Sequence, residues 1–297
     1  MQPLKPALTY AEQVNHLSDY HNLHIDDYKK AEEILSKVNY YRLSAYGLGL
    51  KQKADPEKYI DGITLQHIYR LYQFDSLFRN ALMHIIEHIE IRLRTQIANY
   101  LALKYGPEGY ADPANFISRI TKKQKTAHEL LMDSFKEECE RQKNTPIVRH
   151  HEDKYGGHYP IWVAIELFSF GNLSSLYSIM QDEDKKAIAR LYNTNQDYLG
   201  SWILSLVEIR NICAHYSRVY NMPLKQAPYL YREHRQYRTG RINKVFPVIL
   251  VIKRMLSKDL LWKSFEEKLE SLIDEYQDVL KLSFMNFPAE WRSVLRS

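Results

Sequence analysis

Cysteine is scarce in this chain of 297 residues. Cys139 and Cys213 lie far apart, and neither belongs to a C-x-x-C pair or a zinc-ligand spacing, so a disulfide framework and a zinc site are not expected. Glycine (10) and proline (11) are also few, and stretches of alternating polarity are short, which argues against a sheet-rich fold. No run of about 18 apolar residues predicts a membrane span. The first residues lack the pattern of a secretory signal, so we expect a cytoplasmic location.

Several chemical motifs are also missing. The chain has no phosphate-cradling Walker loop and no G-x-S-x-G nucleophile elbow. One group of potential ligands, His150, His151, Asp153 and His158, lies in a segment that we predict to be a mobile loop (143–160), without the tight spacing of a metal site. The sequence therefore predicts neither a metal nor a cofactor.

Helical periodicity dominates what is present. The longest stripe of apolar residues, with a period near 3.6, begins after Thr64 and continues to Gly106-Pro107, with a kink or break considered near Asp75. Shorter helices are expected after Thr9 and Asp27, and Gly171 is expected to interrupt an apolar helix that begins at Pro160. Further helices are predicted over 121–143, from Asp197 to about 217, over 242–256, over 258–281 and after Pro288.

These signals predict an all-α helical bundle. We expect an N-terminal helical extension over residues 1–60 and a main helical domain over residues 61–297, with one continuous domain over 1–297 as the alternative.

A polar motif, Arg210-Asn211-x-x-x-His215, ends the helix that is predicted from Asp197. On an ideal helix Arg210 and His215 point about 140° apart, so a site made by one helix alone is doubtful. A second copy, related by a two-fold axis, would bring both sets of side chains to one seam. The motif therefore predicts a homodimer or a chain with two half-sites, and the alternative is an ordinary polar helix end.

The residue types suit one reaction. Histidine titrates near neutrality and transfers protons, and arginine binds phosphate and stabilises developing negative charge. Asn211 could orient the histidine or the substrate. Together they suit attack of an RNA 2′-hydroxyl on the neighbouring phosphate, which leaves a 2′,3′-cyclic phosphate and a 5′-hydroxyl without a metal. DNA lacks this nucleophile.

A second copy of the pattern occurs upstream, from Arg79 to His84 within "RNALMH". It is either a second half-site or a coincidence on a solvated helix face, where Arg79 would pair with Asp75 at a spacing of four residues. We favour coincidence.

Positive charge is concentrated after the motif, where residues 229–244 carry five cations and one anion, a net charge of +4 against +5 for the whole chain. Such a run predicts contacts with RNA phosphates, and a solvated basic loop is the alternative. Tyr229, Tyr231 and Tyr237 are candidates for stacking on bases. The cations of the run are Arg232, Arg235, Arg238, Arg241 and Lys244. Glu166, inside an apolar helix, is expected to be buried with a partner such as Arg210, in a supporting or purely structural role.

Four ordered segments resemble the Abi-like (abortive infection) family, which belongs to the HEPN superfamily of helical ribonucleases. They are "KPALTYAEQVNHL" with "VNYYRLSAYGLGLK", the long block from "LYQFDSLFRN" to "GPEGY", "PIWVAIELFSFGNLSSLY" and "RNICAHYSRVYN". The resemblance implies a HEPN-type bundle and catalysis by Arg210, Asn211 and His215. It adds Arg218 and Asn221 as polar positions that support the site or contact RNA. His84 matches no catalytic position of the family. Tyr216 and Tyr220 depart mildly from the family pattern.

The expected function is therefore a metal-independent endoribonuclease that acts in phage defence or as the toxin of a toxin–antitoxin pair. The expected partners are an RNA substrate, a cognate non-coding RNA or protein inhibitor, and a second copy of the chain. The alternative is a non-catalytic RNA-binding module that holds a cognate small RNA.

Overall fold

The computed structural model describes residues 6–237, 243–256 and 258–296, and it confirms the all-α prediction. In these ranges the chain forms α-helices and short 3-10 helices, with isolated β-bridges but no strand. Within the same ranges no helix is long and apolar enough to cross a membrane.

The longest helix-free connection between described helices is residues 215–231, which follows the helix that carries the motif. The α-helices are α1 (Tyr10–Asp19), α2 (Tyr28–Lys37), α3 (Tyr40–Ser44), α4 (Leu65–Tyr105), α5 (Ala127–Arg141), α6 (Pro146–Tyr155), α7 (Ile161–Leu167), α8 (Phe170–Ile179), α9 (Asp182–Arg190), α10 (Gln196–Ala214), α11 (Phe246–Leu256), α12 (Leu260–Glu275) and α13 (Trp291–Arg296). The 3-10 helices are η1 (Ala45–Leu50), η2 (Gly109–Ala111), η3 (Pro113–Asn115), η4 (Arg232–Tyr237) and η5 (Leu282–Met285).

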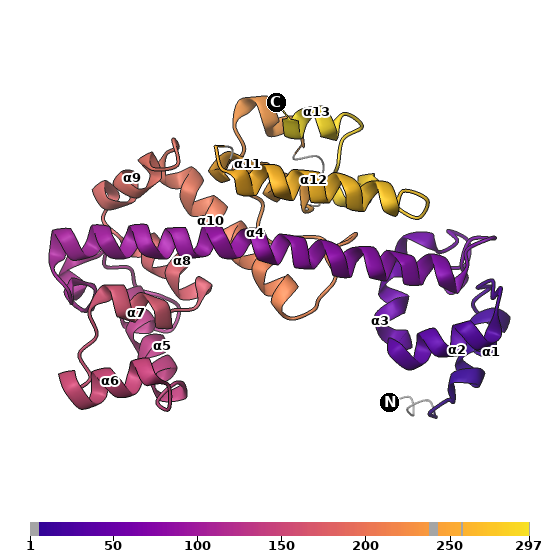
Figure 1. The fold of residues 1–297 in the computed structure, drawn as a ribbon, viewed down its shortest axis with the longest axis horizontal. Helices are drawn as coiled ribbons and strands as arrows, with labels where there is room; N and C mark the ends of the chain where they lie inside the picture. Colours follow the sequence, from indigo (N-terminus) through magenta and orange to yellow (C-terminus); the bar gives the residue numbers. More distant parts are fainter. Residues whose placement is uncertain (1–5, 238–242, 257, 297) are drawn as a thin grey trace.

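Helix α4 is the axis of the molecule (Figure 1). Its 41 residues begin at the cap Thr64, whose hydroxyl accepts a hydrogen bond from the backbone N–H of His67 at 3.0 Å. They end at Gly106, which has a φ of 81°. The break considered near Asp75 does not occur, because the buried Asp75 carboxylate finds partners outside the helix and the helical backbone continues through it.

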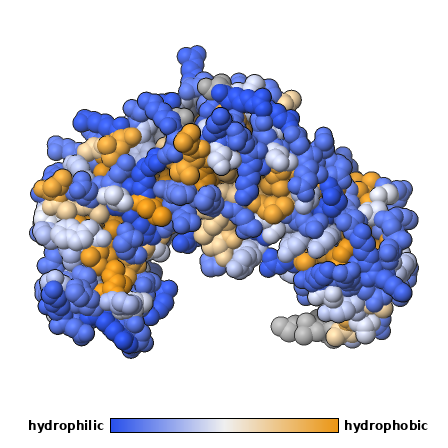
Figure 2. All heavy atoms as spheres, in the orientation of Figure 1, coloured by the Kyte–Doolittle hydropathy of each residue, from blue (hydrophilic) through white to orange (hydrophobic). Residues whose placement is uncertain are grey.

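Most of the other helices lie around this axis in three groups. Helices α7, α10 and α12 pack directly on α4. Figure 1 shows α11, α12 and α13 along one side, with α5 to α8 near one end of α4 and α1 to α3 near the other. These last two groups extend to the same side, so the space-filling view is an arch with a hollow between them (Figure 2). The C-terminal end of α10 lies on that side of α4, at the middle of the arch (Figure 1).

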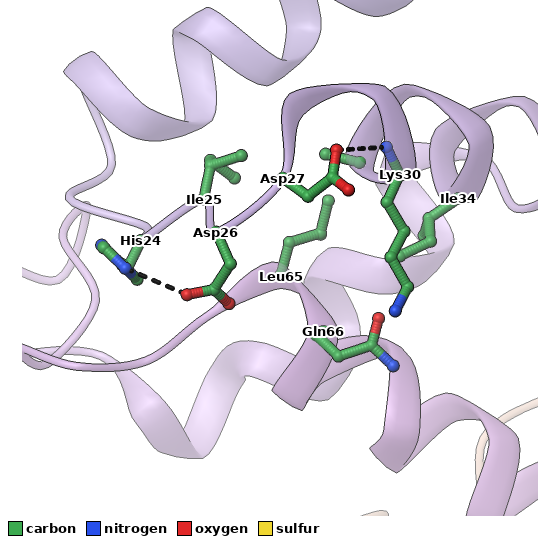
Figure 3. A pocket seen from close by; sticks show the side chains of 9 residues that line it. His24, Ile25, Asp26, Asp27, Lys30, Ile34, Leu65 and Gln66 are labelled. Carbon is green, nitrogen blue, oxygen red and sulfur yellow. Dashed lines mark hydrogen bonds and ion pairs between the residues drawn. The ribbon is translucent and has the colours of Figure 1, made fainter.

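The N-terminal helices have the expected caps. Thr9 and Glu12 form the capping box of α1, and Asp27 caps α2 by accepting a hydrogen bond from the backbone N–H of Lys30 at 3.1 Å. A cavity of about 160 Å³ lies where α2 and α4 begin (Figure 3). There His24 Nε2 is 3.1 Å from Asp26 Oδ1. The division of the chain at residue 60 stays a prediction, although α2, α3 and η1 pack on α4.

Two local predictions were wrong. The segment predicted as a mobile loop contains α6, which has Pro146 in its first turn and the left-handed Gly156 (φ 61°) as its C-cap; both are ordinary helix-boundary residues. Gly171 does not interrupt the next apolar segment. The break lies at Phe168 and Ser169, and the Ser169 hydroxyl caps α8 by accepting a hydrogen bond from the backbone N–H of Asn172 at 3.0 Å.

Candidate functional site

Helix α10 carries the Arg-Asn-x-x-x-His motif at its C-terminal end. Its N-cap is Asn195, two residues before the predicted start at Asp197, and its apolar side is buried against the core. His215 is the C-cap and is exposed. The next residue, Tyr216, adopts a left-handed conformation with a φ of 54°.

The chain after the helix is fixed by two backbone hydrogen bonds. The N–H of Tyr216 donates to the carbonyl of Cys213 at 3.1 Å, and the N–H of Ser217 donates to the carbonyl of Ile212 at 2.9 Å. This is the pattern of a Schellman motif, in which glycine usually occupies the position of Tyr216. A tyrosine ring that is 70% exposed thus stands next to His215 in a strained conformation.

Arg210 forms an ion pair with a carboxylate of α4, although its Nε makes no hydrogen bond among the contacts of the described residues. Its Nε lies 3.5 Å from Glu90 Oε2, while Arg94 Nη2 donates to Glu90 Oε1 at 2.5 Å. Glu90 and Arg94 are both buried, and Arg94 also donates to the backbone carbonyl of Ile165. Because one carboxylate serves two guanidinium groups, the cluster keeps a net positive charge. Arg210 remains partly exposed, and its Nη1 donates to Asn211 Oδ1 at 3.2 Å.

The motif residues of one chain face different surroundings. Arg210 faces α4, whereas Asn211 and His215 are exposed. No hydrogen bond or ion pair joins the side chains of Arg210 and His215 among the contacts of the described residues. This agrees with the angle of about 140° that separates positions five apart on a helix.

The backbone after the motif is clamped to α4 by Asp75. This carboxylate is 0% exposed, and its Oδ1 accepts hydrogen bonds from the backbone N–H groups of Val219 (3.0 Å) and Tyr220 (2.7 Å). Its Oδ2 accepts from the hydroxyl of Tyr46 at 2.7 Å and from Arg79 Nη1. Three separate parts of the sequence therefore meet at one buried acid.

The contacts of Asp75 also explain the second copy of the motif, from Arg79 to His84, which we call the look-alike motif. The predicted pairing of Arg79 with Asp75 is confirmed, but its placement on a solvated face was wrong, because both side chains are buried. His84 is exposed and contacts the ring of His88. Arg79 thus has a structural partner and does not lie beside His84.

Arg218, Asn221 and Lys244 come together behind the motif. Lys244 Nζ donates to Asn221 Oδ1 at 3.0 Å, and a backbone hydrogen bond of 2.8 Å from Leu224 to Asn243 holds the two segments side by side. Burial and the nearby charge of Arg218 lower the pKa of Lys244. Burial also lowers the pKa of Arg218, whose guanidinium lies over the ring of Tyr46.

Three of the five cations of the basic run, Arg232, Arg235 and Lys244, lie among the described residues, and the contacts of the run with RNA stay a prediction. Arg232 and Arg235 are exposed on η4, Lys244 is buried, and Arg238 and Arg241 lie outside the described residues. Tyr231 and Tyr237 are packed in the protein, against Tyr198 and Phe246 respectively.

Tyr229 is the exposed tyrosine of this segment, with 49% of its surface accessible.

The prediction for Glu166 was wrong. Glu166 is exposed on α7, and the carboxylate beside Arg210 is Glu90. Residues of α7 turn by about 100° per position, and its buried positions include Ile161, Ala164 and Ile165, so Glu166 lies on the outward face together with the exposed Trp162 four residues before it.

Glu90, Arg94 and Asp75 are parts of the site that we did not predict from the sequence. A signal was present: acid–arginine pairs four residues apart, Asp75 with Arg79 and Glu90 with Arg94, interrupt the apolar stripe of the longest helix. Charged pairs at stripe positions must be buried, so each one marks a place where another segment docks.

The fold and the site define an all-α protein in which the central helix α4 contacts the end of the helix that carries the Arg-Asn-x-x-x-His motif. Glu90 of α4 pairs with the arginine of the motif, and Asp75 of α4 binds the backbone that follows it. A family model described as "Abi-like protein" matches residues 33–221, which include α4 and the whole motif, and the chain belongs to this family. Membership supports a function of the abortive-infection type. No curated protein and no solved structure matches the chain.

Proposed function

We propose that this protein is a metal-independent endoribonuclease of HEPN type that acts in abortive infection or as the toxin of a toxin–antitoxin pair. The observation that carries the proposal is the end of α10, where Arg210 is held by Glu90 and bonded to Asn211, while Asn211 and His215 are open to solvent. The family match, which includes this helix end, supports it.

Each residue has a role in the proposed reaction. His215 takes the proton of the RNA 2′-hydroxyl as that oxygen attacks the adjacent phosphorus, and the bond from phosphorus to the 5′-oxygen of the next nucleotide breaks as that oxygen takes a proton from water. Arg210 binds the phosphate and stabilises the charge that develops on its oxygens. Glu90 holds the guanidinium without neutralising it, because Arg94 is the closer partner of that carboxylate. Asn211 orients the phosphate or the histidine.

The proposed active unit is a homodimer. Within one chain Arg210 and His215 belong to different faces of α10, so a second copy is needed to bring an arginine of one subunit to a histidine of the other. The hollow of the arch, where α10 ends, leaves room for such a partner or for RNA (Figures 1 and 2). A cognate non-coding RNA or a protein inhibitor is the proposed means of keeping the enzyme silent.

The test is incubation of the purified chain with RNA in excess chelator. We expect cleavage products with 2′,3′-cyclic phosphate and 5′-hydroxyl ends, and loss of cleavage in His215→Ala and Arg210→Ala. His84→Ala is the matched control, because it removes an exposed histidine from the look-alike motif and should cut like the parent. Intact RNA, or equal activity of His215→Ala and the parent, would refute the proposal.

A non-catalytic RNA-binding module is the second candidate, because a chain that does not dimerise would keep Arg210 and His215 apart and lack a complete catalytic site. In that case RNA binds in a salt-dependent manner and remains uncut, and His215→Ala binds like the parent.

A further inference from the structure

A groove of about 630 Å³ runs along the N-terminal half of α10, between that helix, α8 and the segment 225–229. The α10 residues that line it include Asp197, Gly200 and Leu204. With 100° per residue, these positions lie within about 60° of one another around the helix axis. Asn211 and His215, seven and eleven residues after Leu204, fall on the same side. The exposed residues of the motif therefore lie on the groove's side of α10, beyond Leu204, the last α10 residue that lines it.

The segment 225–229, which forms the outer wall of the groove, is hydrogen-bonded to α10. Both carboxylate oxygens of Glu208 accept backbone hydrogen bonds of 2.7 Å, from Lys225 and Gln226. Farther along, Ser201 Oγ accepts from the backbone N–H of Tyr229 at 2.8 Å, and Trp202 Nε1 donates to the carbonyl of Tyr229 at 2.7 Å. The backbone of Tyr229 is thus fixed on both sides while its ring stands at the groove with 49% of its surface exposed.

The lining has the chemistry of a sugar–phosphate and base site. Its charged residues are two cations, Arg119 and Lys185, and one anion, Asp197. Lys185 is paired with Asp182 at 2.9 Å, whereas Arg119 is exposed and donates a long hydrogen bond, 3.3 Å, to the hydroxyl of Ser178.

Serine hydroxyls line much of the remaining surface, and they can donate to and accept from a sugar or a phosphate. The exposed ring of Tyr229 offers a face on which a base can stack.

We propose that this groove binds a single-stranded segment of the RNA next to the point of cleavage, with a base on Tyr229 and a phosphate on Arg119. The placement of this RNA segment next to the cleaved bond rests on the proposed function. It assumes that cleavage occurs at Asn211 and His215, which lie on the same side of α10 as Leu204. The substrate class is therefore single-stranded RNA that extends along α10 from the motif toward its N-terminus.

The experiment measures binding of a fluorescently labelled, 12-nucleotide 2′-O-methyl RNA by anisotropy, together with the mass of the free protein in solution. The methyl group blocks the nucleophile, so the probe reports binding to the unaltered catalytic residues. Tyr229→Ala should weaken binding about 5- to 160-fold, the range that stacking of one base spans. Tyr155→Ala, on α6 and similarly exposed (47%), is the control and should bind like the parent.

Two more variants probe the groove in other ways. Arg119→Glu should weaken binding. It should also reduce the slope of the logarithm of the binding constant against the logarithm of salt concentration by the amount of about one phosphate contact. Gly200→Leu should block the groove without changing charge, because a Cβ at Gly200 already reaches ordinary contact, 3.5 Å, with Cε1 of Tyr177. Since leucine is a better helix former than glycine, this variant is expected to fold.

The outcomes separate the two proposals. Weaker binding in all three groove variants, at unchanged mass, supports the groove even if the parent never cleaves RNA. Cleavage by the parent with unaltered binding in the variants refutes the groove and leaves the proposed function standing. Loss of a dimer in the variants also refutes it, because the groove would then hold a second copy of the chain.

Discussion

Replacing Asp75 with asparagine tests how strongly the central helix holds the backbone behind the motif. Asp75 is fully buried, and four donors converge on its two oxygens: Arg79, the hydroxyl of Tyr46 and the N–H groups of Val219 and Tyr220. Asparagine keeps the shape but removes the charge, and its NH₂ group turns a donor toward other donors. Arg79 is then left buried without its counter-charge.

The expected loss can be estimated from general energetics. Removing one partner of a buried ion pair costs about 3–5 kcal/mol. An unfolding entropy of about 2.1 cal/mol/K per residue gives about 0.6 kcal/mol/K for 297 residues, so the melting temperature should fall by about 5–8 °C. Thermal unfolding followed by circular dichroism at 222 nm measures this shift.

A matched exposed pair provides the control. Asp278 accepts a hydrogen bond from Arg70 at 2.8 Å, but its side chain is 57% exposed, so Asp278→Asn should cost less than about 1 kcal/mol. The double variant Asp75→Asn/Arg79→Met should recover part of the loss, because it removes the unpaired cation. A melting temperature for Asp75→Asn that equals that of Asp278→Asn would show that the clamp contributes little.

Three further predictions concern Glu90, Tyr216 and Cys213. Glu90→Gln should lower RNA cleavage by releasing Arg210, whereas Glu87→Gln, an exposed neighbour on α4, should not; equal rates would exclude a positioning role for Glu90. Tyr216→Gly should raise the free energy of unfolding by about 0.5 kcal/mol, because glycine adopts the left-handed conformation without strain; denaturant titration measures this, and a loss would contradict it. Burial raises the pKa of Cys213 to about 12, so its thiol should react far more slowly with Ellman's reagent at pH 8 than that of the less buried Cys139. Since the folded pKa of Cys213 lies above that of the unfolded chain, its contribution to stability is complete below about pH 9 and falls as the pH rises toward about 12.

Much of the fold could be predicted because local signals were consistent. The Thr9–Glu12 capping box, the cap at Asp27 and the apolar stripe after Thr64 are short-range features, and the structure confirms all three. The predicted loop at 143–160 shows the limit of such signals, because its charged residues concealed α6. Polar sequence is as compatible with a surface helix as with a loop, and the helix forms when one face has something to pack against.

By itself, the sequence determined the helical class, the ends of its longest helix and the polar motif whose arginine and histidine must point apart. These depend on caps and on the geometry of one helix, which operate over a few residues.

Only the tertiary structure decided that Glu90 rather than Glu166 holds Arg210, that Asp75 fixes the backbone after the motif, and that Lys244 lies buried beside Asn221. Each of these contacts joins segments far apart in the chain. The desolvation of a buried charge selects whichever partner the packing brings within reach, and sequence spacing carries no information about that choice.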